Sequence, residues 1–292
     1  FTGSPNVGAH IAEMAAKNHA SITLELGGKS PAIILPNASI KRHIKQLAWG
    51  KTLNAGQTCI APDYALCPQD KIQELAEAFA NEIKRMFGDT DAKRHESKDF
   101  VHIVDKRATE RHAALIKDAI AKGATQVIGG VSDIDNCYTP ITVLTNVTPD
   151  MEIMKSEIFG PILPIVAYKN LEEAIQFVQS RPKPLALYIF GTNKSEIDYV
   201  LSNTTSGSSC VNNTIIQIEN LEVPFGGVGM SGTGNYHGFY GFKTFSHERN
   251  IMQQKCFDVV TFFHPPYGKH FGSLHSKIQG LAEKALRYIK SM

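Results

Sequence analysis

The sequence has 292 residues, 42% of them hydrophobic, and balances 30 Lys and Arg against 28 Asp and Glu for a formal net charge of +2. A chain of this length can bury a sizeable core in one large or two medium domains, and its balanced charge argues against nucleic acid as a partner. Five widely spaced cysteines, with no C-x-x-C and no His pair at ligand spacing, argue against a metal site and suit a reducing compartment.

The chain opens with F-T-G-S-P-N-V-G at residues 1–8. This segment resembles the end of a strand and a glycine turn, with Ser4 as N-cap and Pro5 at the first position of a helix that reaches about residue 18. A helix N-terminus can bind the phosphates of a dinucleotide, although an ordinary strand-to-helix turn has the same pattern. Because the first residue is not Met and belongs to a strand end, we expect the chain to be a fragment.

Two short motifs follow, L-E-L-G-G-K-S-P at residues 24–31 and N-A-G-Q-T-C at residues 54–59. Strands are expected at residues 22–26 and 32–35, and a helix capped by Ser39 is expected to reach about residue 53. Glu25 and Cys59 each lie beside glycines that allow a ligand to approach the backbone closely, so they are candidates for a base and its nucleophile. A structural carboxylate and a packed cysteine are the alternatives.

The rest of the chain alternates between short apolar runs and amphipathic segments. This alternation predicts an α/β fold with a parallel sheet. Residues 89–99 are expected to form a polar surface loop. Helices are predicted at residues 71–87, 108–122, 171–179 and 195–201. Strands are predicted at residues 64–67, 125–128, 138–144, 162–167, 185–190 and 209–211.

A glycine-rich segment covers residues 224–232, and its Gly227, Gly229 and Gly232 match the spacing G-x-G-x-x-G. That spacing marks a dinucleotide site only where a helix follows at once and an acidic residue stands about twenty positions further on. Neither pattern is found here, so we interpret the segment as a loop.

Four motifs resemble those of the aldehyde dehydrogenase superfamily. They are L-E-L-G-G-K-S-P at residues 24–31, N-A-G-Q-T-C at 54–59, E-I-F-G-P at 157–161 and P-F-G-G at 224–227. The segments S-G-T-G-N-Y-H-G and F-K-T-F-S-H-E-R-N are most similar to its class 3 branch, and the resemblance covers about residues 1–265. It implies that an aldehyde, of medium or long chain or aromatic, is oxidised to the carboxylic acid with NAD or NADP through a cysteine thiohemiacetal and thioester. Asn213 and Gln217 depart from the class 3 pattern, which leaves the substrate preference open.

The resemblance also implies residue roles and an assembly. Glu25 and Cys59 would be catalytic, Glu157 would hold the nicotinamide ribose, and Phe159 would pack beside the nicotinamide ring. A homodimer is implied, and a non-catalytic dimerisation module is the alternative. The expected divisions are a cofactor-domain remnant at 1–26, a catalytic domain at 27–235, an oligomerisation segment at 236–262 with a strand at 245–253, and a tail at 263–292. The other residues implied at the cofactor site are Gly3, Ser4, Val7, Gly8 and Leu26.

The last segment, residues 269–292, has apolar residues at helical spacing and five basic residues against one acidic residue. Such a helix can lie on an anionic membrane surface or dock on protein, and both alternatives stay open. We expect no signal peptide from the given sequence, in which no apolar run approaches the roughly 18 residues that a membrane span needs. We therefore expect an intracellular protein, either cytoplasmic or peripherally attached to a membrane.

Overall fold

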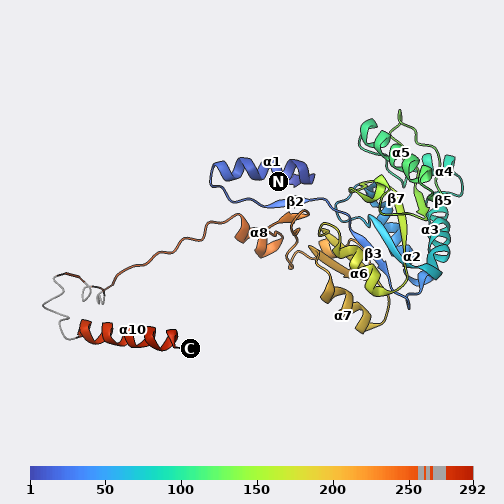
Figure 1. Ribbon diagram of the computed structural model, residues 1–292. Coiled ribbons are helices and arrows are strands. Elements are labelled where there is room, and N and C mark those ends of the chain that lie inside the picture. The colour runs from blue at the N-terminus through green and yellow to red at the C-terminus, as the bar shows by residue number, and fades with distance from the viewer. Residues whose placement is uncertain (256–259, 261–263, 266–273, 292) are drawn as a thin grey trace. The chain divides into compact units, whose positions relative to one another are not determined.

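The computed structural model describes residues 1–255, 260, 264–265 and 274–291. The chain forms two compact units, Phe1–Ser246 and His247–Met292. The first unit contains every predicted site residue, and the second contains the tail. The helices and strands of both units are shown in Figure 1.

A seven-stranded sheet organises the first unit (Figure 1). Neighbouring strands pair in parallel except β5 and β6, which pair antiparallel with a bulge between Gln126 and Ile128. The predicted parallel sheet is thus confirmed, with one antiparallel edge added. In spatial order the strands are β5 (Thr125–Ile128), β6 (Thr142–Thr145), β7 (Ile162–Tyr168), β4 (Tyr64–Pro68), β3 (Pro31–Ile34), β8 (Ala186–Phe190) and β9 (Ser208–Val211).

Helices cover both faces of this sheet because its strands are apolar on both sides. In β3, Ile34 joins the core beneath α2 (Ile40–Thr52) and α3 (Ile72–Phe87). Its neighbour Ile33 points to the opposite face and joins a second core. The helices that contribute to that second core are α5 (Lys106–Ala121), α6 (Leu171–Gln179) and α7 (Lys194–Asn203).

Three details differ from the expectations. The segment predicted as a surface loop contains a short helix, α4 (Asp91–His95), because Thr90 accepts a capping hydrogen bond from the Lys93 N–H. Strand β6 begins at Thr142, later than predicted, because Tyr138 instead pairs with Asp133 in an isolated bridge. The structure also contains the short 3₁₀ helices η2 (Gln69–Lys71) and η3 (Glu152–Met154).

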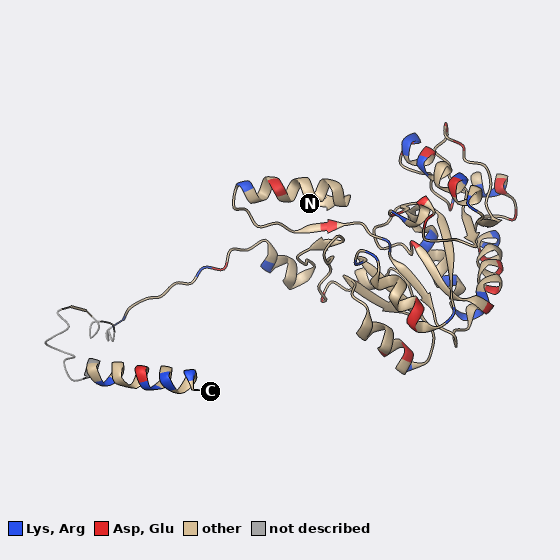
Figure 2. Cartoon of the chain, in the orientation of Figure 1, with Lys and Arg blue, Asp and Glu red and all other residues tan. Residues whose placement is uncertain are grey.

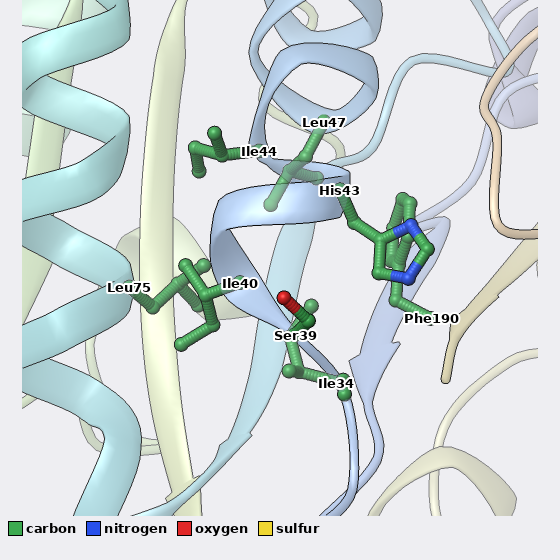
Figure 3. Close-up of a pocket in the computed structure, with 9 residues that line it drawn as sticks. Ile34, Ser39, Ile40, His43, Ile44, Leu47, Leu75 and Phe190 are labelled. Atoms are coloured by element: carbon green, nitrogen blue, oxygen red, sulfur yellow. The ribbon is translucent and has the colours of Figure 1, made fainter. Parts of the chain in front are cut away.

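A small gap lies beneath the first turn of α2 (Figure 3). Ser39 precedes this helix as predicted, but its hydroxyl makes no capping hydrogen bond. Apolar side chains such as Ile40 and Leu75 line most of the gap, and the ring of His43 lies against that of Phe190 with centroids 5.6 Å apart. Because the gap is at the start of α2 and Cys59 follows its end, we interpret it as a packing defect of the core.

A second, three-stranded sheet holds Glu25 in its central strand. The central strand β2 (Leu24–Leu26) pairs in parallel with β1 (Thr2–Gly3) and antiparallel with β10 (Gly232–Thr233). Helix α1 (Pro5–Lys17) begins directly after β1. A helix, α8 (Gly238–Thr244), does follow the glycine-rich segment, contrary to the prediction. It starts six residues after Gly232, so the segment does not open a helix as the dinucleotide fingerprint requires.

The tail unit contains helix α10 (Leu274–Lys290), which confirms a helix for the described part of residues 269–292. Its apolar side chains Ile278, Leu281 and Ile289 are exposed within this unit. Residues 245–253 form no strand in the described chain. An oligomerisation strand gains its hydrogen bonds from a partner chain, so that assignment stays a prediction. Nor is any helix among the described residues both long and apolar enough to span a membrane.

A buried ion pair joins the loop after β2 to the segment that leads into β4. The Lys29 ammonium binds the Asp63 carboxylate and also donates to the carbonyl oxygens of Ile153 at 2.8 Å and Ser156 at 3.0 Å. The second Asp63 oxygen accepts the Ile158 N–H at 2.9 Å. Three distant chain segments therefore meet at one carboxylate.

Replacing Lys29 with Met leaves the buried Asp63 charge without its cation. We expect the free energy of unfolding to fall by about 3–5 kcal/mol, measured by denaturant titration. Lys155 is the control because its ion pair with Glu152 is half exposed. Lys155→Met should cost less than about 1 kcal/mol. Equal losses in the two variants would contradict the structural role of the buried pair.

Candidate active site

Cys59 follows a tight turn at the end of α2. The short 3₁₀ helix η1 (Leu53–Gly56) includes Asn54 and Ala55 at φ of 52° and 54°, and Gly56 at 73°. Gly56 is required here, since a Cβ would lie 2.4 Å from the Gly160 carbonyl oxygen. The side chain of Gln57 fixes the turn by donating to the Asn54 carbonyl at 3.0 Å and accepting from the Val104 N–H at 2.8 Å.

The Cys59 thiol is half-buried, and two carboxylates act on it electrostatically. Burial, followed by the charges of Glu157 and Glu25, raises the pKa of Cys59 to about 11. The N–H groups of Cys59 and Ile60 act in the opposite direction and lower this pKa. At neutral pH the thiol is therefore mostly protonated, and a nucleophilic role requires a base that removes its proton.

Glu25 has the properties of a general base. Its side chain is only 7% exposed, and neither carboxylate oxygen has a hydrogen-bond partner among the described residues. Burial raises the pKa of Glu25 to about 7. Figure 2 shows an acidic residue on strand β2, whose one acidic residue is Glu25. A buried, unpartnered carboxylate that is half ionised near neutral pH suits general acid–base catalysis.

Glu157 lies against the loop that follows β2. A Cβ added at Gly27 would lie 1.9 Å from its Oε2 atom, so the glycine makes room for this carboxylate. Burial, then the charge of Asp63, raises the pKa of Glu157 to about 8, while the Gly28 N–H lowers it. Phe159 has a φ of 49° and is 39% exposed, so its ring is available to a ligand.

Four of the residues predicted for the cofactor, Gly3, Ser4, Val7 and Gly8, lie at the start of α1. Ser4 caps this helix by accepting the Val7 N–H at 3.5 Å, and the Val7 side chain is exposed. Gly3 pairs with Leu26 across β1 and β2. A Cβ at Gly8 would lie 2.6 Å from Leu26, so this glycine lets the helix pack on β2. Gly3 and Gly8 therefore contact the strand that carries Glu25.

The sequence did not reveal two residues of this region, Asp63 and Lys51. Lys51 is only 1% exposed, and its Nζ has no hydrogen-bond partner among the described residues. Burial lowers the pKa of Lys51 to about 8, against the charges of Asp63 and Glu157, which raise it. Lys51 stands four residues after the buried Leu47 and hence on the core side of α2. This spacing is the feature of the sequence that could have identified Lys51 as buried.

Comparison with known proteins decides the family. The sequence pattern of the aldehyde dehydrogenase family matches residues 1–251 of this chain. The chain belongs to this family. Among curated aldehyde dehydrogenases, it is 42% identical over 252 residues to family 3 member A2 of Rattus norvegicus. That match covers 86% of the chain and 50% of the rat protein, so the chain spans about half the length of the curated relatives it matches.

Solved aldehyde dehydrogenases share the fold. The substrate-bound AldH of Staphylococcus aureus is 39% identical with a TM-score of 0.85, and the match covers 95% of this chain and 59% of that one. An aldehyde dehydrogenase of Mycobacterium tuberculosis complexed with NAD⁺ is 28% identical with a TM-score of 0.78, covering 89% and 53%. These likenesses confirm the predicted family and α/β fold, and they support NAD(P) as the cofactor of the family.

The electrostatics of Cys59 give a prediction for thiol alkylation. Because the carboxylates of Glu157 and Glu25 raise the Cys59 pKa, Glu157→Gln and Glu25→Gln should lower it. Between pH 9 and pH 11 both carboxylates are ionised, so each variant should alkylate several-fold faster than wild type at pH 9. Below about pH 7 the difference should shrink as the carboxylates protonate.

The measurement is the rate of Cys59 alkylation by iodoacetamide against pH, followed by peptide mass mapping. The exposed Glu110 provides the control, and Glu110→Gln should leave the profile unchanged. A shift of the profile to higher pH in Glu157→Gln would contradict the assigned electrostatics.

Proposed function

We propose that the protein carrying this chain oxidises an aldehyde to the carboxylic acid with NAD or NADP, with Cys59 as nucleophile and Glu25 as base. The observation that supports this most is the buried Glu25 carboxylate, which has no hydrogen-bond partner among the described residues and acts electrostatically on the Cys59 thiol. A structural carboxylate at such a position would be hydrogen-bonded. A carboxylate left without a partner suits proton transfer instead.

The proposed reaction begins when the Cys59 thiol loses its proton to water and the thiolate adds to the carbonyl carbon. The backbone N–H of Cys59 is a candidate donor to the resulting oxyanion. Loss of hydride from this thiohemiacetal leaves a thioester on Cys59. Glu25 then removes a proton from a water molecule, the water oxygen attacks the thioester carbon, and the acid leaves as the thiolate is restored. The net change adds one oxygen from water and removes a hydride and a proton.

The residues present fit a nicotinamide dinucleotide, which when bound accepts the hydride. The first turn of α1, with Gly3, Ser4, Val7 and Gly8, would hold phosphates at a helix N-terminus. Glu157 would accept the ribose hydroxyls from its position against Gly27. Lys51 would support Glu157, since the Lys51 charge lowers the pKa of that carboxyl.

For the substrate, we propose an aldehyde of medium or long chain or an aromatic aldehyde, from the resemblance to class 3. The likeness to family 3 member A2 supports the resemblance to class 3. We further propose a homodimer. Contact of the tail with a membrane stays a prediction, and the comparisons do not support it.

A non-catalytic dimerisation module is the alternative function. Glu25 and Cys59 count against it, because a module of this kind gains nothing from an unpartnered buried carboxylate, which costs free energy of folding.

Cys59→Ala in the protein carrying this chain should abolish aldehyde oxidation, because no other described cysteine lies beside Glu25 and Glu157. The measurement is formation of reduced cofactor with an aromatic and a long-chain aldehyde. Cys137→Ala is the control for loss of a half-buried thiol and should keep most of the activity. Substantial turnover by Cys59→Ala would refute the proposed function.

Glu25→Gln should leave the first turnover in place and slow the later ones by about a hundredfold or more, as loss of a general base does. Stopped-flow absorbance should then show a burst of reduced cofactor followed by a slow steady state. Absence of the burst would place Glu25 at an earlier step, the deprotonation of Cys59.

A further inference from the structure

One tyrosine hydroxyl connects the residue after Cys59 to a distant segment of the chain. Tyr188 lies on β8 and is fully buried. Its hydroxyl donates to the Ile60 carbonyl at 2.5 Å. The same oxygen accepts the Ile215 N–H at 3.3 Å and the Gln217 Nε2–H at 3.1 Å. One donated and two accepted hydrogen bonds use the full capacity of a hydroxyl group.

Ile60 is the residue through which this hydroxyl reaches the nucleophile. The Ile60 N–H stabilises the thiolate form of Cys59, while the Ile60 carbonyl is held by Tyr188. The first half of the turn is fixed separately by Gln57. Tyr188 therefore supports the half of the turn whose N–H groups lower the pKa of Cys59.

The segment on the other side of the hydroxyl is strained. Ile215 has φ 66° and ψ −37°, a conformation that a β-branched residue rarely adopts. The Ile216 N–H reaches back to the Thr214 carbonyl at 2.7 Å, which closes a γ-turn of the rare type. Directly after it comes η4 (Ile216–Ile218). Strain of this kind persists only where neighbouring contacts hold it, and the Tyr188 hydroxyl is one such contact.

Gln217 lies in η4, and of its two side-chain amide atoms the nitrogen alone makes a hydrogen bond to a described residue. Its Nε2 donates to Tyr188, whereas its Oε1 is buried without a partner among the described residues. An amide left half satisfied adds little to stability. Its contribution is the hydrogen bond to Tyr188.

We propose that Tyr188 is a positioning residue for the nucleophile, and that its hydroxyl couples the strained Ile215 turn and the Gln217 amide to the backbone beside Cys59. Movement of η4 then changes the orientation of the Ile60 N–H and with it the reactivity of the thiol. The inference rests on the proposed function only in treating Cys59 as the nucleophile.

The test is Tyr188→Phe, with Tyr168→Phe as the matched control. Tyr168 is also buried and donates to a backbone carbonyl, that of Ile34, at the same 2.5 Å, but it faces the other core. We expect both variants to lose similar thermal stability. Only Tyr188→Phe should slow iodoacetamide alkylation of Cys59, by about fivefold at pH 9 per folded molecule, the factor that one net hydrogen bond represents. Its alkylation profile should shift to higher pH.

Gln217→Leu tests the coupling without removing the tyrosine. It should slow alkylation by a smaller factor with little change in thermal stability, and it should have no further effect when combined with Tyr188→Phe. Alkylation at the wild-type rate in Tyr188→Phe would overturn the proposal, as would additive slowing in the double variant. Because alkylation requires no turnover, this result is independent of whether Cys59→Ala abolishes aldehyde oxidation.

Discussion

The geometry of the site depends on a single buried carboxylate, that of Asp63. One of its oxygens binds Lys29 in the loop after β2, and the other accepts the N–H of Ile158, next to Glu157. Asp63 itself lies four residues after Cys59. The base, the thiol and the second glutamate are thus attached to one charge, although they come from distant parts of the chain. Such a pair is costly to bury, and its hydrogen bonds to the Ile153 and Ser156 carbonyls offset that cost.

Around this charge the site contains an excess of unsatisfied groups. The Glu25 oxygens and the Lys51 ammonium have no partners among the described residues, and burial shifts the pKa of each toward neutrality. A protein optimised for stability alone would neutralise or pair these groups. Their presence fits a site whose ligands supply the missing partners, in line with the trade between stability and function at active sites.

Much of the fold was predictable because local patterns determine it. Helix α6 has the predicted limits, since Asn170 caps it and its apolar residues keep a helical period. The pairing of Glu25 with Cys59 is a prediction from resemblance alone, because no local pattern brings a strand and a turn together. Lys51 and Tyr188 were missed because a lysine near a helix end usually faces water and a strand tyrosine usually packs. Their roles depend on contacts between residues far apart in sequence, such as Tyr188 with Ile60.

The bulge in β5 affects whether another chain can pair with this edge of the sheet. A regular edge strand offers a row of free N–H and C=O groups on which another chain can form a further strand, the first step of aggregation. Between Gln126 and Ile128 the register of β5 shifts, which breaks the even spacing of those groups. The antiparallel edge of this otherwise parallel sheet is therefore a poorer template for pairing with another chain. The cost is an irregular hydrogen-bond ladder between β5 and β6.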